Sequence, residues 1–364
     1  MNIKNNEIGV TTGSIATATA LSALKQITSN ESPDIVNIQT PSSSLDIIIE
    51  KNEKISDNVA KSIAIKYPYN DPDVTVNLEI ITTVELVDEI KDKKVIITGG
   101  AGIGKVTKPG LQIPIGEYAI NPVPREMIKD NLYNHIPKNK SAKVKIAIPK
   151  ACEIVNNTMN PRLGIVGGIS ILGTTGIARA MSTDAYKRSI TPQIDISIGE
   201  KLDDLVFVPG NIGEKIALEK LNVNKDQIIQ TGNYIGYMFD YASKKGIKSF
   251  TFLGHIGKLV KVAGGIFNTK HSIADGRKEI IITHSALRGA SIDIINKIYS
   301  SETTESMISI LKEESLDKFV FNSIAKAIKD KCTDKFDIDL NVILVDMKGN
   351  ILNTNFDNNL IKEN

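Results

Sequence analysis

The chain has four histidines, and His255 is the one that lies between a predicted strand and a predicted helix. Residues 249–253 are apolar enough for a buried strand, and Ile256, Leu259 and Val260 would share one face of the following helix. A neutral imidazole at a helix N-terminus suits proton exchange or hydrogen bonding, so His255 is the candidate catalytic residue. The alternative, which the sequence leaves open, is that His255 only stabilises the turn.

Glycine and asparagine follow other predicted strands in the second half of the chain. A glycine turn lets backbone N–H groups approach a ligand closely, and asparagine can hydrogen-bond the polar edge of a ligand. Asparagine is also tolerated for turn geometry alone. We predict that four such turns line one edge of a sheet and bind a cofactor. Their residues are Gly173, Thr174, Thr175, Gly176, Gly210, Asn211, Gly232, Asn233 and Gly254.

The stretch Gly99–Lys105 fits the first part of a nucleotide-binding P-loop, GxxxxGK. Val106 stands where a P-loop needs Ser or Thr to reach magnesium, and Pro109 would end the helix that holds the phosphates. We therefore reject the P-loop. A glycine-rich strand connection with Lys105 and Lys108 along it is the better interpretation, and it could contact an anion.

Hydroxyl side chains begin a predicted helix near the start of the chain. Thr12 or Ser14 can cap a helix that runs to about Gln26. Such a helix N-terminus could bind an anion. It could also be a capped core helix without a ligand.

The elements that must position these residues differ between the two halves of the chain. The first half predicts a hairpin at 35–39 and 45–50, a helix from Ser56 to about Lys66, and a long strand at 74–87. The second half repeats strand, glycine turn and amphipathic helix. That alternation predicts a parallel sheet with ligands at the carboxyl ends of its strands.

We therefore predict an α/β fold with two domains. Residues 1–155 form a mixed α+β domain. Residues 156–364 form a Rossmann-like βα domain with a mainly parallel sheet, a helical extension to about Lys331 and a closing hairpin.

The net charge is only +2, and aromatic residues make up 5% of the chain. No basic block with interleaved aromatic residues is present, which argues against nucleic acid as a partner. No apolar run is long enough to span a membrane, and the polar segment Met1–Thr12 lacks the apolar core of a secretory signal. We expect a cytoplasmic protein with neither nucleic acid nor membrane as a partner, and we leave a homo-oligomer open.

The two cysteines, Cys152 and Cys332, are far apart in the sequence. They form no CxxC pair and have no metal-ligand spacing. We therefore expect free thiols and no metal site in the protein.

Several stretches, in this order, resemble the cobalt-precorrin-5B C1-methyltransferase family of anaerobic cobalamin biosynthesis. Each stretch is a weak signal alone, and their joint order and spacing make the resemblance specific. It extends from about residue 9 to about residue 290. The stretches are residues 11–14, 102–110, 119–125, 161–176, 209–213, 254–258 and 274–277.

The resemblance implies S-adenosylmethionine as methyl donor and a partly built corrin ring as acceptor, with cobalt only as part of that substrate. Such chemistry needs alignment and exclusion of water more than a strong base, because the donor is already activated. The ring carries many carboxylates, which basic side chains would bind. The candidate substrate-binding residues are Thr12, Ser14, Lys105, Lys108, Arg125, Arg162, Lys258 and Arg277.

The chain departs from the family pattern at three places. Ile15 stands where the family usually has cysteine, residues 66–70 replace an acidic stretch, and residues 150–153 replace a glycine pair followed by glutamate. Two alternatives therefore stay open. One is a nucleotide-dependent kinase or dehydrogenase, and the other is a corrinoid-binding protein without turnover.

Overall fold

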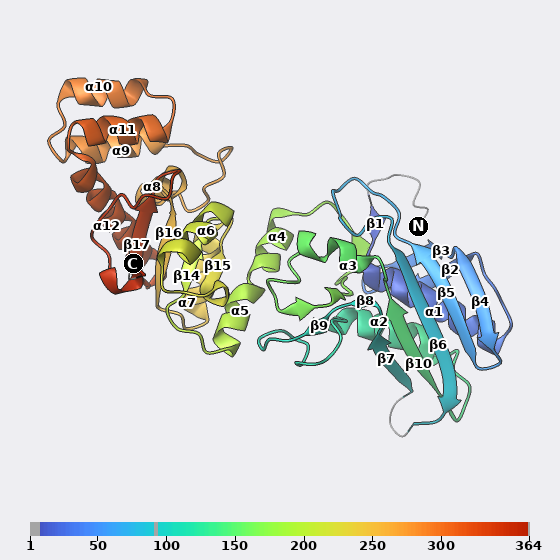
Figure 1. Ribbon diagram of the computed structural model, residues 1–364. Coiled ribbons are helices and arrows are strands. Elements are labelled where there is room, and N and C mark those ends of the chain that lie inside the picture. The colour runs from blue at the N-terminus through green and yellow to red at the C-terminus, as the bar shows by residue number, and fades with distance from the viewer. Residues whose placement is uncertain (1–7, 91–93, 363–364) are drawn as a thin grey trace. The chain divides into compact units, whose positions relative to one another are not determined.

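A computed structural model describes residues 8–90 and 94–362 (Figure 1). The chain divides into two compact units, with the division between Ala185 and Tyr186. This division lies later than the predicted boundary after residue 155, because residues 165–178 pair with strands of the first unit. The mixed α/β class is confirmed. The predicted absence of a secretory signal rests partly on residues 1–7, which lie outside the described residues.

The first unit is built on a five-stranded sheet. Its strands follow the order β4-β5-β6-β10-β7, in which β10 and β7 are parallel and the other neighbours are antiparallel. The bounds are β4 (Lys51–Ser56), β5 (Val59–Ile65), β6 (Glu79–Asp88), β10 (Lys140–Ala147) and β7 (Val95–Gly99).

The helix predicted from Ser56 to Lys66 is wrong, because this segment forms the β4–β5 hairpin. In β5 the buried positions alternate and carry the small residues Ala60, Ser62 and Ala64. Alanine and serine hide the alternation that a strand of larger apolar residues would show. Their small size lets the neighbouring helix approach the sheet closely.

That neighbouring helix is α1 (Thr12–Thr28), whose residues 12–24 are buried on all sides. A helix that is buried all round must be enclosed by other elements. The sheet lies on one side of α1, and α2 (Pro122–Tyr133) and the hairpin β2 (Ile35–Gln39)–β3 (Ser44–Ile48) also pack against it (Figure 1). Two hydroxyls of α1 are satisfied inside this core. Thr19 Oγ1 lies 2.7 Å from Thr82 Oγ1, and Ser22 Oγ donates to Asn52 Oδ1 at 2.7 Å.

Short strands and turns complete the first unit and explain its glycine-rich stretch. A Cβ on Gly102 would lie 1.8 Å from the Ile148 carbonyl oxygen, and one on Gly104 would lie 2.8 Å from the Gly168 oxygen. Glycine is therefore required here for backbone-to-backbone packing. The elements are β1 (Gly9–Val10), β8 (Gly102–Ile103), β9 (Lys105–Val106), α3 (Ala151–Ile154), η1 (Val155–Asn157), β11 (Ile165–Val166), β12 (Gly168–Ile169) and β13 (Ile177–Ala178).

The second unit contains the predicted parallel sheet. All three strand pairings are parallel, and the order is β15-β14-β16-β17. The bounds are β14 (Val206–Val208), β15 (Ile228–Gln230), β16 (Ser249–His255) and β17 (Asp339–Val345). Helix α4 (Thr183–Ile190) contains the division between the two units. The helices that follow it are α5 (Pro192–Gly199), α6 (Asn211–Lys220), α7 (Ile235–Lys244), α8 (Ile256–Ala263), α9 (Arg277–Ala286), α10 (Ile292–Ser300), α11 (Thr304–Glu313) and α12 (Asp317–Phe336), with single turns η2 (Lys225–Gln227) and η3 (Asn358–Leu360).

Each face of this sheet has its own core. Val206, Val208 and Leu253 pack with the apolar face of α6. Alternate residues face the other way, where Phe207 and Phe250 stack at 4.1 Å between ring centres and Phe239 of α7 joins them. The alternation along each strand therefore places α6 on one face and α7 on the other.

The helical extension is confirmed, and Figure 1 shows α9, α10 and α11 as a layer beside α8 and α12. The closing hairpin is reduced to a single bridge between Val345 and Ile351, because β17 pairs along its whole length with β16. Among the described residues, no helix combines the length and the apolar composition that a membrane crossing requires.

Candidate active site

The carboxyl ends of the four parallel strands form one edge of the second unit, called here the carboxyl edge. From β14 the chain crosses to β15 on one side and then returns to β16 on the other side. A reversal of this kind leaves a crevice between the diverging connections, where ligands bind in open α/β sheets. Three of the four predicted turns, at Gly210, Gly232 and Gly254, lie at this edge.

The turn after β14 is open and polar. A Cβ on Gly210 would have no neighbour within 4 Å. Asn211, the first residue of α6, accepts a hydrogen bond from Gln230 Nε2 at 2.9 Å, and the same amide donates to Glu214 at 2.5 Å. Glu214 is 8% exposed. The sequence analysis missed Gln230 and Glu214, since neither lies in a glycine turn.

The turn after β15 contacts Tyr186 and the segment that leads to α9. Gly232 has a φ of +60°, and a Cβ there would lie 3.1 Å from the Tyr186 hydroxyl. The Asn233 carbonyl accepts a hydrogen bond from the Thr269 N–H at 3.0 Å. Asn233 therefore fastens the segment that leads to α9. Beside it, the Lys187 ammonium lies 5.6 Å from the ring centre of Tyr234.

Gly254 is required for packing. A Cβ at this position would lie 2.6 Å from Leu259 Cδ1 and 2.8 Å from Pro209 Cδ. The absence of a side chain lets β16, the start of α8 and the turn after β14 come together. The predicted cofactor contact at Gly254 has no further support from its surroundings.

His255 ends β16 and caps α8. Its Nδ1 accepts from the Gly257 N–H at 3.2 Å, so the hydrogen bonding assigns the ring proton to Nε2. Nε2 then donates to Glu305 Oε1 at 2.9 Å. The same carboxylate oxygen accepts from the Met347 N–H at 3.2 Å. Glu305 thus joins the ends of β16 and β17, and the turn role that the sequence left open for His255 has a geometric basis.

Lys258 and Lys261 lie one turn apart on α8. Lys261 is 3% exposed, and its ammonium donates to the Ala274 carbonyl at 2.7 Å. Lys258 is half-buried, and among the described residues no carboxylate or hydrogen-bond acceptor pairs with its ammonium. Desolvation first, and then the charge of Lys261, lower the pKa of Lys258.

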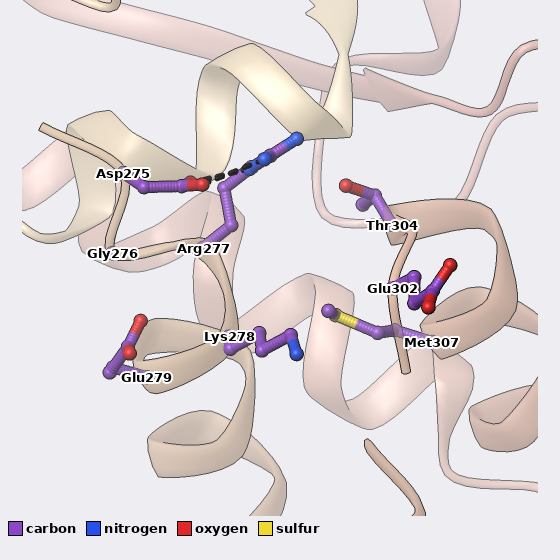
Figure 2. Close-up of a pocket in the computed structure, with 8 residues that line it drawn as sticks. All are labelled: Asp275, Gly276, Arg277, Lys278, Glu279, Glu302, Thr304 and Met307. Carbon is purple, nitrogen blue, oxygen red and sulfur yellow. Dashed lines mark hydrogen bonds and ion pairs between the residues drawn. The ribbon is translucent and has the colours of Figure 1, made fainter. Parts of the chain in front are cut away.

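A cavity of about 160 Å³ lies between the N-terminal ends of α9 and α11 (Figure 2). Arg277 and Asp275 pair on its wall at 2.5 and 2.7 Å. The hydrogen bond from Arg277 is the largest cause that holds the pKa of Asp275 at about 2. The cavity is lined by Asp275, Gly276, Arg277, Lys278, Glu279, Glu302, Thr304 and Met307.

The fourth predicted turn, residues 173–176, lies in the first unit, so the expected single edge of four turns is corrected. The Gly13 N–H donates to the Leu172 carbonyl at 2.9 Å, and Ser14 Oγ donates to the Gly176 carbonyl at 2.6 Å. Thr12 Oγ1 accepts from the Leu172 N–H at 2.9 Å. Residues 172–176 therefore close the N-terminus of α1, and no room is left there for the predicted anion.

Within this turn, glycine serves packing and the threonines lie at the surface. Gly173 has a φ of +139°, and Gly176 packs against Thr40. Thr174 and Thr175 are exposed, and the Thr175 carbonyl accepts from Ser42 Oγ at 2.6 Å. The helix cap is Thr11, whose Oγ1 accepts from the Ser14 N–H at 3.1 Å, in place of the predicted Thr12 or Ser14.

The other basic candidates also lie in the first unit. Arg125 donates to the Ile120 carbonyl at 2.8 Å and to Glu117 at 3.1 Å. The Lys105 ammonium lies 4.9 Å from the ring centre of Tyr118. The structure therefore does not gather all the predicted basic residues at one place, and it puts Lys258 and Arg277 in the second unit. Lys108 packs its stem against Gly164, and Arg162 lies half-buried in the turn that leads to Gly164.

Two of the three departures from the family pattern, Ile15 and residues 66–70, have structural explanations in the first unit. Ile15 is fully buried in α1, so its side chain fills the core. In residues 66–70, Lys66 is buried against Asp73 and donates to Thr75 at 2.7 Å. Tyr69 donates to Asp73 at 3.0 Å and covers Gly9.

Both cysteines are free thiols. Cys152 is exposed, whereas burial raises the pKa of Cys332 to about 12. Among the described residues, no three side chains of histidine, cysteine, aspartate or glutamate gather as metal ligands would.

Two family models match this chain. One, described as CbiD, matches residues 1–180, and the other, described as CbiD, C-terminal domain, matches residues 268–355. Three relatives are named cobalt-precorrin-5B C(1)-methyltransferase. The protein of Methanobrevibacter smithii is 60% identical and covers 98% of this chain and 99% of its own. The protein of Methanosphaera stadtmanae is 49% identical and covers 94% of this chain and 90% of its own length. The protein of Methanocaldococcus jannaschii is 46% identical and covers 96% of this chain and 96% of its own length.

The chain belongs to the CbiD family. The first CbiD model ends close to the division between the two units, and the C-terminal model covers α9 to β17. The carboxyl-edge residues from Gly210 to His255 lie between the two models. A crystal structure of a cobalamin biosynthesis protein, CbiD, from Archaeoglobus fulgidus is 23% identical, with a TM-score of 0.38 over 74% of this chain and 84% of that one.

Proposed function

We infer that this CbiD-family chain is a methyltransferase that methylates C1 of cobalt-precorrin-5B in cobalamin biosynthesis. The observation that carries this conclusion is the 60% identity to a protein of that name over 98% of the chain. The nucleotide-dependent alternative lacks support, because Gly99 packs against the Tyr118 side chain and Gly102 and Gly104 pack against backbone.

We further propose S-adenosylmethionine as the methyl donor and the second unit as its Rossmann-like binding unit. The crevice at the carboxyl edge supports this assignment, since Gly210 leaves open space there and Asn211, Gln230 and Glu214 supply polar groups. In the reaction, C1 of the ring bonds to the methyl carbon as the carbon–sulfur bond breaks, and sulfur keeps the electron pair. The protein's task is to align the two carbons and exclude water.

Lys258 is the side chain best placed to bind a carboxylate of the corrin ring. Its half-buried ammonium has no acidic partner among the described residues, so a substrate carboxylate would supply the missing counter-charge. The substrate contacts proposed for Lys105, Lys108, Arg125 and Arg162 carry less support, since these side chains contact their own unit.

For His255 we propose a positioning role. Both ring nitrogens are used, one by the Gly257 N–H and one by Glu305. The ring therefore holds the first turn of α8, and with it Lys258, in a fixed place at the carboxyl edge.

The test is a single-turnover reaction with methyl-labelled S-adenosylmethionine and authentic cobalt-precorrin-5B. We expect one label per ring, located at C1 by NMR. A ring that stays unlabelled, although the protein binds it, would show a corrinoid-binding protein without turnover.

A further inference from the structure

The cavity between α9 and α11 is lined by side chains of both charges, with acidic and basic residues on the α9 side and an acidic residue on the α11 side. Arg277, at the start of α9, lies on one wall, and Glu302 and Thr304 lie on the other (Figure 2). Within the described part of the chain, Arg277 pairs with Asp275 and not with Glu302, so the cavity separates Arg277 from Glu302. A ligand that carries both charges could bridge this gap.

Hydrogen-bonding capacity remains on both walls. Thr304 is 5% exposed, and its hydroxyl has no hydrogen-bond partner among residues 8–90 and 94–362. Over the same residues, the Glu302 carboxylate has none either. Arg277 uses Nε and one Nη for Asp275, which leaves further N–H groups of the guanidinium for a ligand.

The size of the cavity limits what it can hold. Sites that enclose a whole drug-sized ligand measure roughly 300–1,000 Å³. At about 160 Å³ this cavity accepts one end of such a ligand or a small molecule, and it excludes a corrin ring.

The cavity adjoins the carboxyl edge. Thr304 Oγ1 would lie 3.3 Å from a Cβ on Gly257, in the first turn of α8. The next residue, Glu305, hydrogen-bonds His255 at the end of β16. A ligand that lies along the edge can therefore extend one end toward α11.

We propose that this cavity binds the α-amino-acid end of the methyl donor, an inference that rests on the proposed function. The donor's ammonium group pairs with the Glu302 carboxylate. Its carboxylate receives hydrogen bonds from the free N–H groups of Arg277 and from the Thr304 hydroxyl. The adenosyl end then extends toward the crevice beside Gly210.

A carboxylate arm of the corrin ring fits the same cavity less well. Three acidic side chains, Asp275, Glu279 and Glu302, line it together with two basic ones, Arg277 and Lys278. Lys278 already donates to the Tyr299 carbonyl at 2.9 Å. An arm with a negative charge alone would leave Glu302 unpaired and repelled, whereas a zwitterion satisfies both walls.

The test compares two probes by calorimetry. S-adenosylhomocysteine carries the amino-acid end, and 5′-methylthioadenosine shares its adenosine and sulfur but lacks that end. We expect Glu302→Gln and Thr304→Val each to weaken binding of S-adenosylhomocysteine about 10-fold and to leave 5′-methylthioadenosine unchanged, since hydrogen bonds to charged groups are the strong ones. Glu313→Gln, which removes an equal charge from the exposed end of α11, should change neither probe.

The outcomes separate this inference from the proposed function. If the wild type binds S-adenosylhomocysteine and both cavity variants bind it equally well, the cavity assignment is overturned and the methyltransferase assignment stands. The same holds if the variants weaken both probes alike. If the wild type binds neither probe, the donor assignment falls and the cavity assignment with it. Thermal unfolding of each variant confirms that it is folded.

Discussion

Two predicted ligand turns of this chain have opposite fates. Residues 173–176 and the turn at Gly210 both follow an apolar stretch, and both contain glycine beside polar residues. In the first unit, residues 172–176 use their carbonyls to close the N-terminus of α1. In the second unit, the space around Gly210 is open. Glycine thus serves internal packing in one turn and leaves access in the other.

The difference depends on what lies opposite the turn. Gly173 faces Thr11, and Gly176 faces Thr40, both more than 130 residues earlier in the chain (173 − 11 = 162 and 176 − 40 = 136). Gly210 faces only solvent because parallel strands end together and their connections diverge. Whether a glycine turn can contact a ligand therefore depends on what lies opposite it in the fold, which the local sequence does not reveal.

The largest expected effect comes from Gly173→Ala. A Cβ there would lie 2.3 Å from the Thr11 hydroxyl at a φ of +139°, so it adds backbone strain and disturbs the helix cap. We expect a loss of about 3 kcal/mol in the free energy of unfolding of the first unit. Hydrogen exchange of the α1 amides measures it.

Gly167→Ala is the matched control for that variant. Gly167 has a φ of +84° with no neighbour near the added Cβ, so it isolates the backbone strain. Gly167→Ala should lower the free energy of unfolding by about 1 kcal/mol. Equal losses in the two variants would contradict the idea that residues 172–176 close α1 by tight contact.

Lys258→Met tests the carboxyl edge of the second unit. Loss of an ammonium that pairs with a substrate carboxylate should lower kcat/KM for the corrinoid about 30-fold, mostly through KM. Lys258→Arg should recover part of the loss. Lys215→Met, on the exposed side of α6, is the control. An unchanged KM in Lys258→Met would place the ring elsewhere.

Acid should lower the stability of the first unit through protonation of Asp73. Burial alone would raise the pKa of this carboxyl, but hydrogen bonds from Lys66 and Thr75 outweigh it and hold the pKa at about 2, below the usual 3.8. The stabilisation is therefore complete above pH 3.8 and is lost as the pH falls toward 2. We expect this stabilisation to contribute about 1–2 kcal/mol to the free energy of unfolding. The free energy of urea unfolding of Asp73→Asn should therefore depend less on acid than that of the wild type. Asp57→Asn, at a fully exposed carboxylate, should behave like the wild type.

The smallest effect is expected at His255. His255→Ala removes the cap of α8 and the partner of Glu305, which should cost about 1 kcal/mol in stability of the second unit. His255→Asn restores a cap but not the reach to Glu305. If His255→Asn recovers the stability that His255→Ala loses, capping alone explains the residue, and the link to Glu305 is dispensable.

The sequence predicted the second unit better than the first. Strands such as Val206–Val208 are unbroken apolar runs that end in glycine, so their positions are visible locally. The β4–β5 hairpin was missed because Ser56 looks like a helix cap and the buried side of β5 is small. Residues 161–178 were placed in the wrong unit because their strands have only two residues and their partners are distant in sequence.

The sequence points to candidate site residues only where a residue lies at the end of a strand. His255 and Lys258 follow a strand directly, so strand-end reasoning finds them. Glu305 and Thr304 approach the same edge from a helix that begins about 50 residues later. No pattern in the sequence connects them, because a helix layer added beside a sheet can be oriented in many ways.

The enclosure of α1 has a consequence for how the chain is made. The helix emerges early from the ribosome, and its residues 12–24 are buried on all sides in the finished unit. The strands β5 and β6 and the helix α2, which cover it, follow later in the chain, and the pairing of Gly9 with Ala178 closes the unit last in sequence order. Contacts between such distant residues form slowly because a long loop must close first. A nascent chain that stops before residue 178 therefore leaves part of α1 exposed to solvent. We expect such a chain to need a chaperone where the finished protein does not.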